Sequence, residues 1–255
     1  MNTATSTREP PEALDEAVHV WLCRPGPPSP EPLGESCRAV LSEDERRRAD
    51  RLRRTSDRRT FEVAHSLIRH ALSLYADVPA SAWSFRANRW GRPEIAGPAH
   101  APRFAFSLSH TRGLVACAIT AGGACGIDVE SFERGGNPLR VARRVLSGPE
   151  LADLEAQPAE AKLGRFLEYW TLKEAYLKAR GVGLSVAMRE VSFALGERGI
   201  RLAAVDPGAL DGPAAWAFAS ERPTPTHALA LALGPPDGPS RTIVMREGLP
   251  RVAEC

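Results

Sequence analysis

Two carboxylates alternate with apolar residues in a short stretch near the middle of the chain. In residues 126–130 (GIDVE), strand alternation would send Ile127 and Val129 to one face and Asp128 and Glu130 to the other. Such neighbouring like charges cost free energy unless a cation offsets them, and Mg²⁺ prefers carboxylate oxygens together with substrate phosphate. The pattern predicts a site for a divalent metal and a phosphate-bearing substrate, with a solvated acidic strand face as the alternative.

A second group of charged residues lies on a predicted amphipathic helix. Phe166, Trp170 and Leu177 form an apolar stripe, and Glu174 lies one turn after Trp170, close to this stripe. A carboxylate placed there would be partly buried and would need a cation. Lys178, four residues later, can supply that cation as a helical ion pair, and a bound metal is the other candidate.

Positive charge in this chain comes almost entirely from arginine, and the only lysines are Lys162, Lys173 and Lys178. The lysine ammonium is a compact point charge on a slim stem, which suits contact with phosphate. Because two of the three lysines fall within residues 166–179, close to Glu174, we interpret this stretch as part of a phosphate-binding site.

The elements that must position these residues alternate between helices and short strands. Strands are expected at 18–22, 83–86, 104–108, 114–120, 125–130, 191–195, 200–203, 214–219 and 228–233. Helices are expected after the capping box of Ser42 and Glu45, from residue 57 onward, and at 139–145, 150–155 and 162–179. Helices followed by hairpin-like strands, twice over, predict an α+β fold: a pseudo-dimer of two similar α/β subdomains, each with a small, mainly antiparallel sheet packed by helices.

This duplication predicts how the chain is divided. Residues 16–122 would form the N-terminal subdomain and residues 123–233 the C-terminal one, with the metal site near their interface. Residues 1–15 are polar and are expected to be disordered, and residues 234–255, rich in proline and glycine, to form a surface tail.

Composition places the chain among ordinary globular proteins. It has 255 residues, of which 43% are hydrophobic, and its five cysteines are scattered and odd in number. No segment approaches the roughly 20 apolar residues of a membrane span, and the polar start lacks the apolar core of a secretory signal. We therefore expect a cytoplasmic protein with no membrane partner and no dependence on disulfides.

The distribution of charge says more than its total. A formal net charge of +2 is too small to indicate a nucleic-acid partner. Eight arginines crowd residues 46–59, and five acidic residues lie among them or just before them. This segment can therefore be a solvated face with local ion pairs, or a surface for a phosphate-bearing ligand or an acidic protein.

Several of these segments, read in chain order, resemble the signature of the 4′-phosphopantetheinyl transferases. They are residues 106–110 (FSLSH), 126–130 (GIDVE) and 170–178 (WTLKEAYLK). Upstream, residues 91–93 (GRP) and the helix through 67–69 (LIR) are similar to elements of the Sfp-type, surfactin-synthetase-activating branch. Motifs in this order at this spacing are far more specific than any one of them.

The resemblance implies a role for each matched residue. Asp128, Glu130 and Glu174 would hold Mg²⁺, with Mn²⁺ as an alternative ion. Contacts with the substrate coenzyme A fall to Ser109 and His110 at the phosphates, Lys178 at the diphosphate, and Arg48 and Arg92 near the nucleotide end.

Three positions leave alternatives open. Glu150 matches an acidic family position among the coenzyme A contacts, yet with Ser147 it also forms a capping box, so it can simply cap a helix. Ser107 stands where many members have asparagine. Thr60 stands where a basic residue is frequent. The adjacent Arg58 and Arg59 can substitute for it, which leaves open which groups bind the adenosine 3′-phosphate.

The implied function is transfer of the 4′-phosphopantetheine arm of coenzyme A to a serine of an acyl or peptidyl carrier protein, with release of 3′,5′-ADP. Glu174 would accept the proton of that serine, directly or through a metal-bound water, while Lys178 and His110 would stabilise the leaving group. His110 can instead be a hydrogen-bonded histidine in a loop after a strand. Carriers of polyketide and nonribosomal peptide synthesis are acidic partners that the arginine-rich segment or the surroundings of residues 139–146 can dock.

Two other classes of function stay open at this point. One is a non-catalytic module that binds coenzyme A or a nucleotide, and the other is a nucleic-acid-binding protein. Four charged motif residues argue against a non-catalytic module: Asp128, Glu130, Glu174 and Lys178. The small net charge argues against a nucleic-acid-binding protein. A monomer is expected.

Overall fold

The computed structural model describes residue 14 and residues 17–26, 33–133, 138–197, 199–204, 212–235 and 241–250. Apart from Leu14, the segment 1–15 that is expected to be disordered lies outside these residues. The first half contains β1 (Ala17–Cys23), α1 (Leu33–Ala39), α2 (Glu43–Asp50), α3 (Thr55–Leu72), β2 (Ser84–Ala87), β3 (Pro93–Gly97), β4 (Ala105–Thr111) and β5 (Leu114–Thr120).

The second half repeats this order of elements. It contains β6 (Cys125–Ser131), α4 (Ala142–Val145), α5 (Gly148–Ala156), α6 (Ala159–Arg180), β7 (Ser192–Gly196), β8 (Gly199–Ala204), β9 (Ala217–Thr224) and β10 (His227–Leu233). A last strand, β11 (Thr242–Glu247), follows.

The pairing of the strands repeats as well. In the first sheet, ordered β11-β1-β5-β4, β5 pairs antiparallel with β1 and β4; in the second, ordered β6-β10-β9, β10 pairs antiparallel with β6 and β9. Each half also has a separate hairpin, β2–β3 or β7–β8. The prediction of an α+β pseudo-dimer is therefore confirmed.

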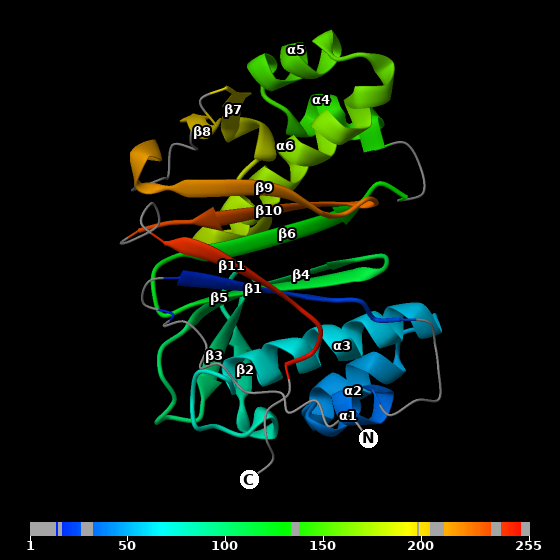
Figure 1. Cartoon of the computed structure of the whole chain (residues 1–255), viewed down its shortest axis with the longest axis vertical. Coiled ribbons are helices and arrows are strands. Elements are labelled where there is room, and N and C mark those ends of the chain that lie inside the picture. The colour runs from blue at the N-terminus through cyan, green and yellow to red at the C-terminus, as the bar shows by residue number, and fades with distance from the viewer. Residues whose placement is uncertain are drawn as a thin grey trace, which may run out of the picture.

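The two halves stack as four layers, with both sheets in the middle (Figure 1). Helices α1–α3 lie beyond one sheet, and α4–α6 lie beyond the other. The residues of β5 are buried on both faces, because Val115, Cys117 and Ile119 pack on the α3 side while Leu114, Ala116 and Ala118 pack between the sheets. This accounts for the absence of polar alternation along β5.

Local signals in the sequence account for several helix ends. The capping box is present at the start of α2, where Ser42 Oγ accepts from the Glu45 amide at 3.2 Å and Glu45 Oε2 accepts from the Ser42 amide at 2.8 Å. Helix α6 ends at Gly181, whose φ of 65° lies in the left-handed region that glycine adopts without strain.

Two expectations about secondary structure were wrong. Residues 234–255 do not form only a tail, because β11 pairs in parallel with β1, and its sequence TIVMRE is typical of a strand although proline and glycine surround it. The strand expected at 214–219 begins only at Ala217, after the short 3₁₀ helix Pro213–Ala215. No helix in the described part of the chain combines the length and the apolar character needed to cross a bilayer.

Candidate active site

The acidic residues of β6 lie at the edge of the second sheet, next to α6. Ile127 and Val129 pack into the core between the sheets, whereas Asp128 and Glu130 point to the opposite side. Asp128 is only 5% exposed and Glu130 is half-buried. The predicted alternation is therefore confirmed, and the acidic face is not simply solvated.

Helix α6 lies directly on β6 because Gly126 has no side chain. A Cβ atom at Gly126 would lie 1.9 Å from the carbonyl oxygen of Ala175 and 2.5 Å from the amide nitrogen of Ala179. This close approach brings Glu174 and Lys178, the neighbours of these alanines, to the carboxylates of β6. The sequence contains a signal for this close packing, namely Gly126 in one motif and the small residues Ala175 and Ala179, four apart, in the other. Sequence reasoning missed this signal.

Lys178 and Asp128 form a half-buried ion pair. Lys178 Nζ lies 2.6 Å from Asp128 Oδ1 and also donates to Ser109 Oγ at 2.9 Å and to the carbonyl oxygen of Ile127 at 3.2 Å. Ser109 Oγ in turn donates to Asp128 Oδ1 at 2.8 Å. The lysine therefore pairs with the carboxylate of β6 and not, as the helical spacing suggested, with Glu174.

Ser107 and Ser109 also join the two sheets. Their hydroxyl oxygens accept from the amides of Ile127 and Val129, at 3.0 and 3.3 Å. Both serines are 6% exposed, so Ser109 serves to hold Asp128 and Lys178 here and does not face open solvent. A contact between Ser109 and a coenzyme A phosphate would require it to turn.

The donor atoms at this site fit a hard divalent cation. Asp128 Oδ2 is buried and has no hydrogen-bond partner within the described ranges, although a buried carboxylate oxygen normally has one. Burial raises the pKa of Glu174, and the charges of Asp128 and Glu130 raise it further while Lys178 opposes them, so three carboxylates influence one another. In the described residues no three His, Cys, Asp or Glu side chains lie close enough together to hold an ion, so the fit is one of donor chemistry.

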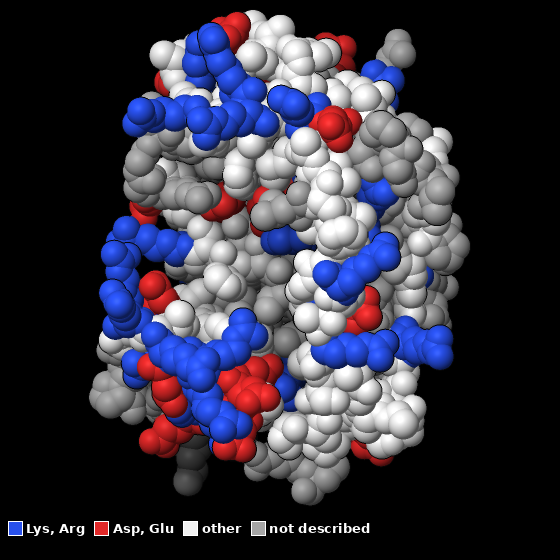
Figure 2. All heavy atoms as spheres, turned by 180° about the vertical axis from the view of Figure 1, so that it is seen from behind, with Lys and Arg blue, Asp and Glu red and all other residues white. Residues whose placement is uncertain are grey.

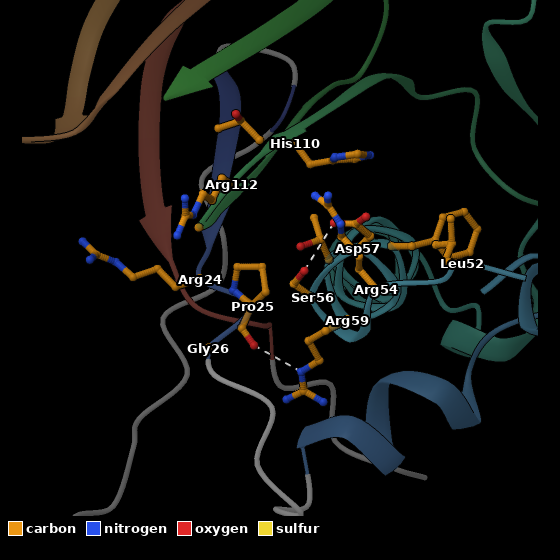
Figure 3. Close-up of a pocket in the computed structure, with 14 residues that line it drawn as sticks. Arg24, Pro25, Gly26, Leu52, Arg54, Ser56, Asp57, Arg59, His110 and Arg112 are labelled. Carbon is orange, nitrogen blue, oxygen red and sulfur yellow. Dashed lines mark hydrogen bonds between the residues drawn. The ribbon is translucent and has the colours of Figure 1, made fainter. Parts of the chain in front are cut away.

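A large hollow opens beside these carboxylates, with a volume of about 870 Å³. The start of α3 contributes Arg54, Ser56, Asp57 and Arg59 to its wall, and the ends of the strands contribute Arg24, His110 and Arg112 on the other side (Figure 3). Figure 2 shows basic side chains around a depression on this back face of the molecule, with acidic atoms visible inside it. Four arginines line the hollow: Arg24, Arg54, Arg59 and Arg112. Arg54 and Arg59 belong to the arginine-rich segment singled out from the sequence, whereas Arg24 and Arg112 were not expected there.

His110 lies between the hollow and the carboxylates. Its ring is exposed at the surface, yet the surrounding protein reduces its solvation, which lowers its pKa, and the positive charge of Lys178 lowers it further. A neutral imidazole at this position can donate a hydrogen bond to an anionic ligand through one ring nitrogen.

A second cavity, of about 270 Å³, lies on the other side of Lys178. Its wall includes Trp90, Leu108 and Leu177 together with Glu174 and Lys178. This cavity is mostly apolar at the end where Trp90 lies, so a ligand that extends from the hollow past Lys178 would meet a charged region first and an apolar one next.

Arg92 and Arg48 do not line the hollow. Arg92 donates to the carbonyl oxygens of Ala179, Cys125 and Phe106, at 2.8, 3.2 and 3.4 Å, and so ties the end of α6 to both sheets. Arg48 is exposed and lies over the ring of Phe61, 5.6 Å from its centroid. Phe61 does line the hollow, so Arg48 acts on it only through this ring.

Local ion pairs involve Arg47 of this segment and Arg38 of α1, just before it. Arg47 pairs with Glu43 and Asp44, and Arg38 pairs with Asp50 and Glu62. Figure 2 accordingly shows basic and acidic side chains interleaved at the end of the molecule that α1–α3 form. Most of α2 is therefore a solvated charged face, while Arg54 and Arg59 at the start of α3 reach the hollow.

Glu150 lies away from these residues, and the helix-cap interpretation describes it. Its Oε2 accepts from the Ser147 amide at 2.7 Å and pairs with Lys173 Nζ at 2.7 Å, while Oε1 accepts from the Phe193 amide at 2.8 Å. Neither side chain of the pair has any exposed surface. Both oxygens of Glu150 therefore have partners inside the second half, as the helix-cap alternative implies.

Comparison with known proteins gives one consistent family. The ACPS family, described as the 4′-phosphopantetheinyl transferase superfamily, matches residues 124–232. The chain is 30% identical to the 4′-phosphopantetheinyl transferase HetI of Nostoc sp. over 220 residues, which cover 86% of this chain and 89% of HetI. It is 27% identical to the 4′-phosphopantetheinyl transferase Sfp of Bacillus subtilis, over 63% of this chain and 69% of Sfp.

A solved structure of a Bacillus anthracis holo-(acyl-carrier-protein) synthase in complex with CoA (3′,5′-ADP) is also similar. It is 19% identical, with a TM-score of 0.37, and the match covers 44% of this chain and 94% of that one.

Proposed function

Because this chain belongs to the 4′-phosphopantetheinyl transferase superfamily, we propose that it transfers the 4′-phosphopantetheine arm of coenzyme A to a serine of an acyl or peptidyl carrier protein. The observation that carries this proposal is the meeting of three carboxylates and a lysine, from a strand and a helix, beside a hollow lined by arginines. Such a site joins the charges needed for a metal and for phosphates in one place.

Coenzyme A would place its nucleotide end in the hollow of about 870 Å³. The adenosine 3′-phosphate would then lie among the arginines of the wall. Thr60 lines the hollow next to Arg59, so Arg59 is our candidate for the basic contact that Thr60 cannot make. The diphosphate lies toward His110 and Lys178, and the pantetheine arm extends toward the apolar cavity of Trp90.

Mg²⁺ would be held by Asp128, Glu130 and Glu174, with Mn²⁺ as an alternative. When bound, such an ion neutralises diphosphate oxygens and orients the phosphorus for attack. Asp128 contributes a buried oxygen without another partner, and Lys178 becomes available to the diphosphate when it leaves Asp128.

In the transfer step, the oxygen of the carrier serine attacks the phosphorus that bears the pantetheine arm, and the bond to the second phosphate breaks. The serine proton would pass to Glu174, directly or through a water molecule. Lys178 and His110 donate hydrogen bonds to the departing 3′,5′-ADP, on which negative charge increases.

The carrier protein would dock at α4. This helix exposes Arg143 and Arg144, while Val145 packs partly buried against the core of the second half. These cations suit an acidic partner, and long-range attraction would mainly raise the rate of association. Service to polyketide or nonribosomal peptide synthesis, a monomeric state and a cytoplasmic location stay predictions.

The test is a transfer assay with an apo carrier protein, coenzyme A and Mg²⁺, read by mass spectrometry as one added phosphopantetheine. Glu174→Ala and EDTA should each abolish the addition, whereas Glu160→Ala, which removes an exposed carboxylate from the same helix, should leave it unchanged. Binding of 3′,5′-ADP without transfer to fatty-acid, polyketide or peptide-synthetase carriers would instead identify a non-catalytic binding module.

A further inference from the structure

The tips of two corresponding hairpins meet near the hollow. One is the β4–β5 turn of the first half, at Arg112 and Gly113, and the other is the β9–β10 turn of the second half. His227, the first residue of β10, connects them and is only 6% exposed. A polar ring buried at such a junction needs partners on both sides.

His227 has those partners. Its Nε2 lies 2.8 Å from the carbonyl oxygen of Arg112, and its Nδ1 lies 2.6 Å from Thr224 Oγ1 and 3.2 Å from Thr226 Oγ1. Because a carbonyl oxygen only accepts, the hydrogen must be on Nε2, and Nδ1 accepts from a threonine hydroxyl. One neutral tautomer therefore satisfies all these groups.

The turn that His227 holds is part of the wall of the hollow. Residues 110–113 all line it, although His227 does not. Thr111 Oγ1 also donates to Glu130 Oε2 at 3.3 Å, so the same turn reaches the predicted metal ligands. Gly113 has a φ of 84°, and the His227 ring packs beside it, 3.7 Å from where a Cβ atom would lie.

We infer that His227 is a positioning residue for coenzyme A. It contacts no substrate, but its hydrogen bond to the Arg112 carbonyl fixes the orientation of the turn, and with it the side chains of His110 and Arg112 around the nucleotide. This inference rests on the proposed function. It links the second half of the pseudo-dimer to a ligand surface that the first half supplies.

The test compares His227→Phe with His227→Gln. Phenylalanine keeps the ring but loses the donor, whereas the amide nitrogen of glutamine can replace Nε2–H. For each variant we would measure the KM for coenzyme A, the KM for the apo carrier, kcat, and the Kd of 3′,5′-ADP by calorimetry.

Loss of one buried hydrogen bond should raise the KM for coenzyme A and the Kd of 3′,5′-ADP about three- to tenfold in His227→Phe. The KM for the carrier should not change and kcat should stay within about twofold, because the reacting groups are intact. His227→Gln should regain most of the affinity. Ser131→Ala, which removes a buried hydroxyl on the strand paired with His227, is the matched control for loss of stability alone and should leave both constants unchanged.

A second variant in the same turn keeps the test informative if His227→Phe misfolds. Gly113→Ala strains the backbone at a φ of 84° and should raise the Kd of 3′,5′-ADP as well. In an Arg112→Ala background, His227→Phe should add less than it does alone, because part of its effect acts through Arg112.

Unchanged affinity for 3′,5′-ADP in both His227→Phe and Gly113→Ala would overturn the inference, as would a loss of kcat with no change in the KM for coenzyme A. The proposed function fails separately, if the wild-type protein transfers no phosphopantetheine while it still binds 3′,5′-ADP.

Discussion

Replacing Glu150 by alanine would leave Lys173 as a buried charge without its carboxylate. Both side chains have no exposed surface, and the Lys173 ammonium would keep only the carbonyl oxygens of Met188 and Val191 as partners. Burial already lowers the pKa of Lys173, and Glu150 is the group that opposes this. The amides of Ser147 and Phe193 would lose their acceptor at the same time.

The expected cost follows from this geometry. Removing one partner of a buried ion pair typically destabilises a protein by about 3–5 kcal/mol, because the other charge stays buried. The unfolding midpoint should therefore fall by about 6–20 °C, given about 2–4 °C per kcal/mol for a chain of this size. Thermal unfolding followed by circular dichroism measures this shift.

The double variant Glu150→Leu with Lys173→Met removes both charges of the buried pair, so it tests whether the loss of stability comes from the unpaired charge. It should be more stable than Glu150→Ala, because no unpaired charge is left in the core. Glu150→Gln, which keeps an acceptor for the amides, should bind coenzyme A with unchanged KM. A Glu150→Ala protein of wild-type stability but with weakened coenzyme A binding would refute this reasoning and restore Glu150 as a ligand contact.

Three further perturbations follow from the same structure. Gly126→Ala would place a Cβ atom 1.9 Å from the Ala175 carbonyl oxygen and force α6 off β6, so we expect a large loss of stability and no detectable transfer in the mass assay. Glu174→Gln should raise the unfolding midpoint at neutral pH in EDTA. The pKa of Glu174 in the folded protein is raised above 4.5, so its ionisation costs stability as pH rises through that folded pKa. In a pH series, the difference in midpoint between the variant and the wild type should disappear below about pH 4.5. For Glu45 the effect on stability has the opposite sign. Burial alone would raise the pKa of Glu45, but hydrogen bonds from His65 and Ser42 and the charge of Arg69 lower it to about 2. Glu45→Gln should therefore destabilise the protein above pH 4.5, and in acid titrations of unfolding its difference from wild type should shrink as pH falls toward 2.

Local periodicity predicted the elements and the direction of key side chains. The alternation of Asp128 and Glu130, the buried face of α3 and both capping boxes depend only on neighbours in sequence, so the sequence contains the information. The partner of Lys178 was not predictable in this way. Helical spacing suggested Glu174, whereas the packing of α6 on Gly126 places the lysine against Asp128, 50 residues earlier.

The architectural contacts of Arg92 and Glu150 and the strand β11 were not predicted, for the same physical reason. A side chain in a family motif can serve the ligand or the architecture, and only long-range contacts decide between them. Arg92 binds carbonyl oxygens from three distant segments, and Glu150 meets Lys173 across the core of the second half. The parallel pairing of β11 with β1 joins strands from opposite ends of the chain, which no local pattern indicates.

The position of the site follows from how the duplicated halves are joined. Strands β4 and β6 are edge strands of the two sheets, and they lie side by side in parallel, with residue 107 opposite 127 and residue 109 opposite 129. The amides of Ile127 and Val129 donate to serine hydroxyls and not to backbone carbonyl oxygens. In an ordinary parallel ladder, backbone carbonyl oxygens would accept these hydrogen bonds, and no polar side chain would lie between the edges. Here Ser109 joins the two halves and also binds Asp128 and Lys178. Any ligand that draws Lys178 away from Asp128 must therefore rearrange hydrogen bonds of Ser109 that hold the halves together.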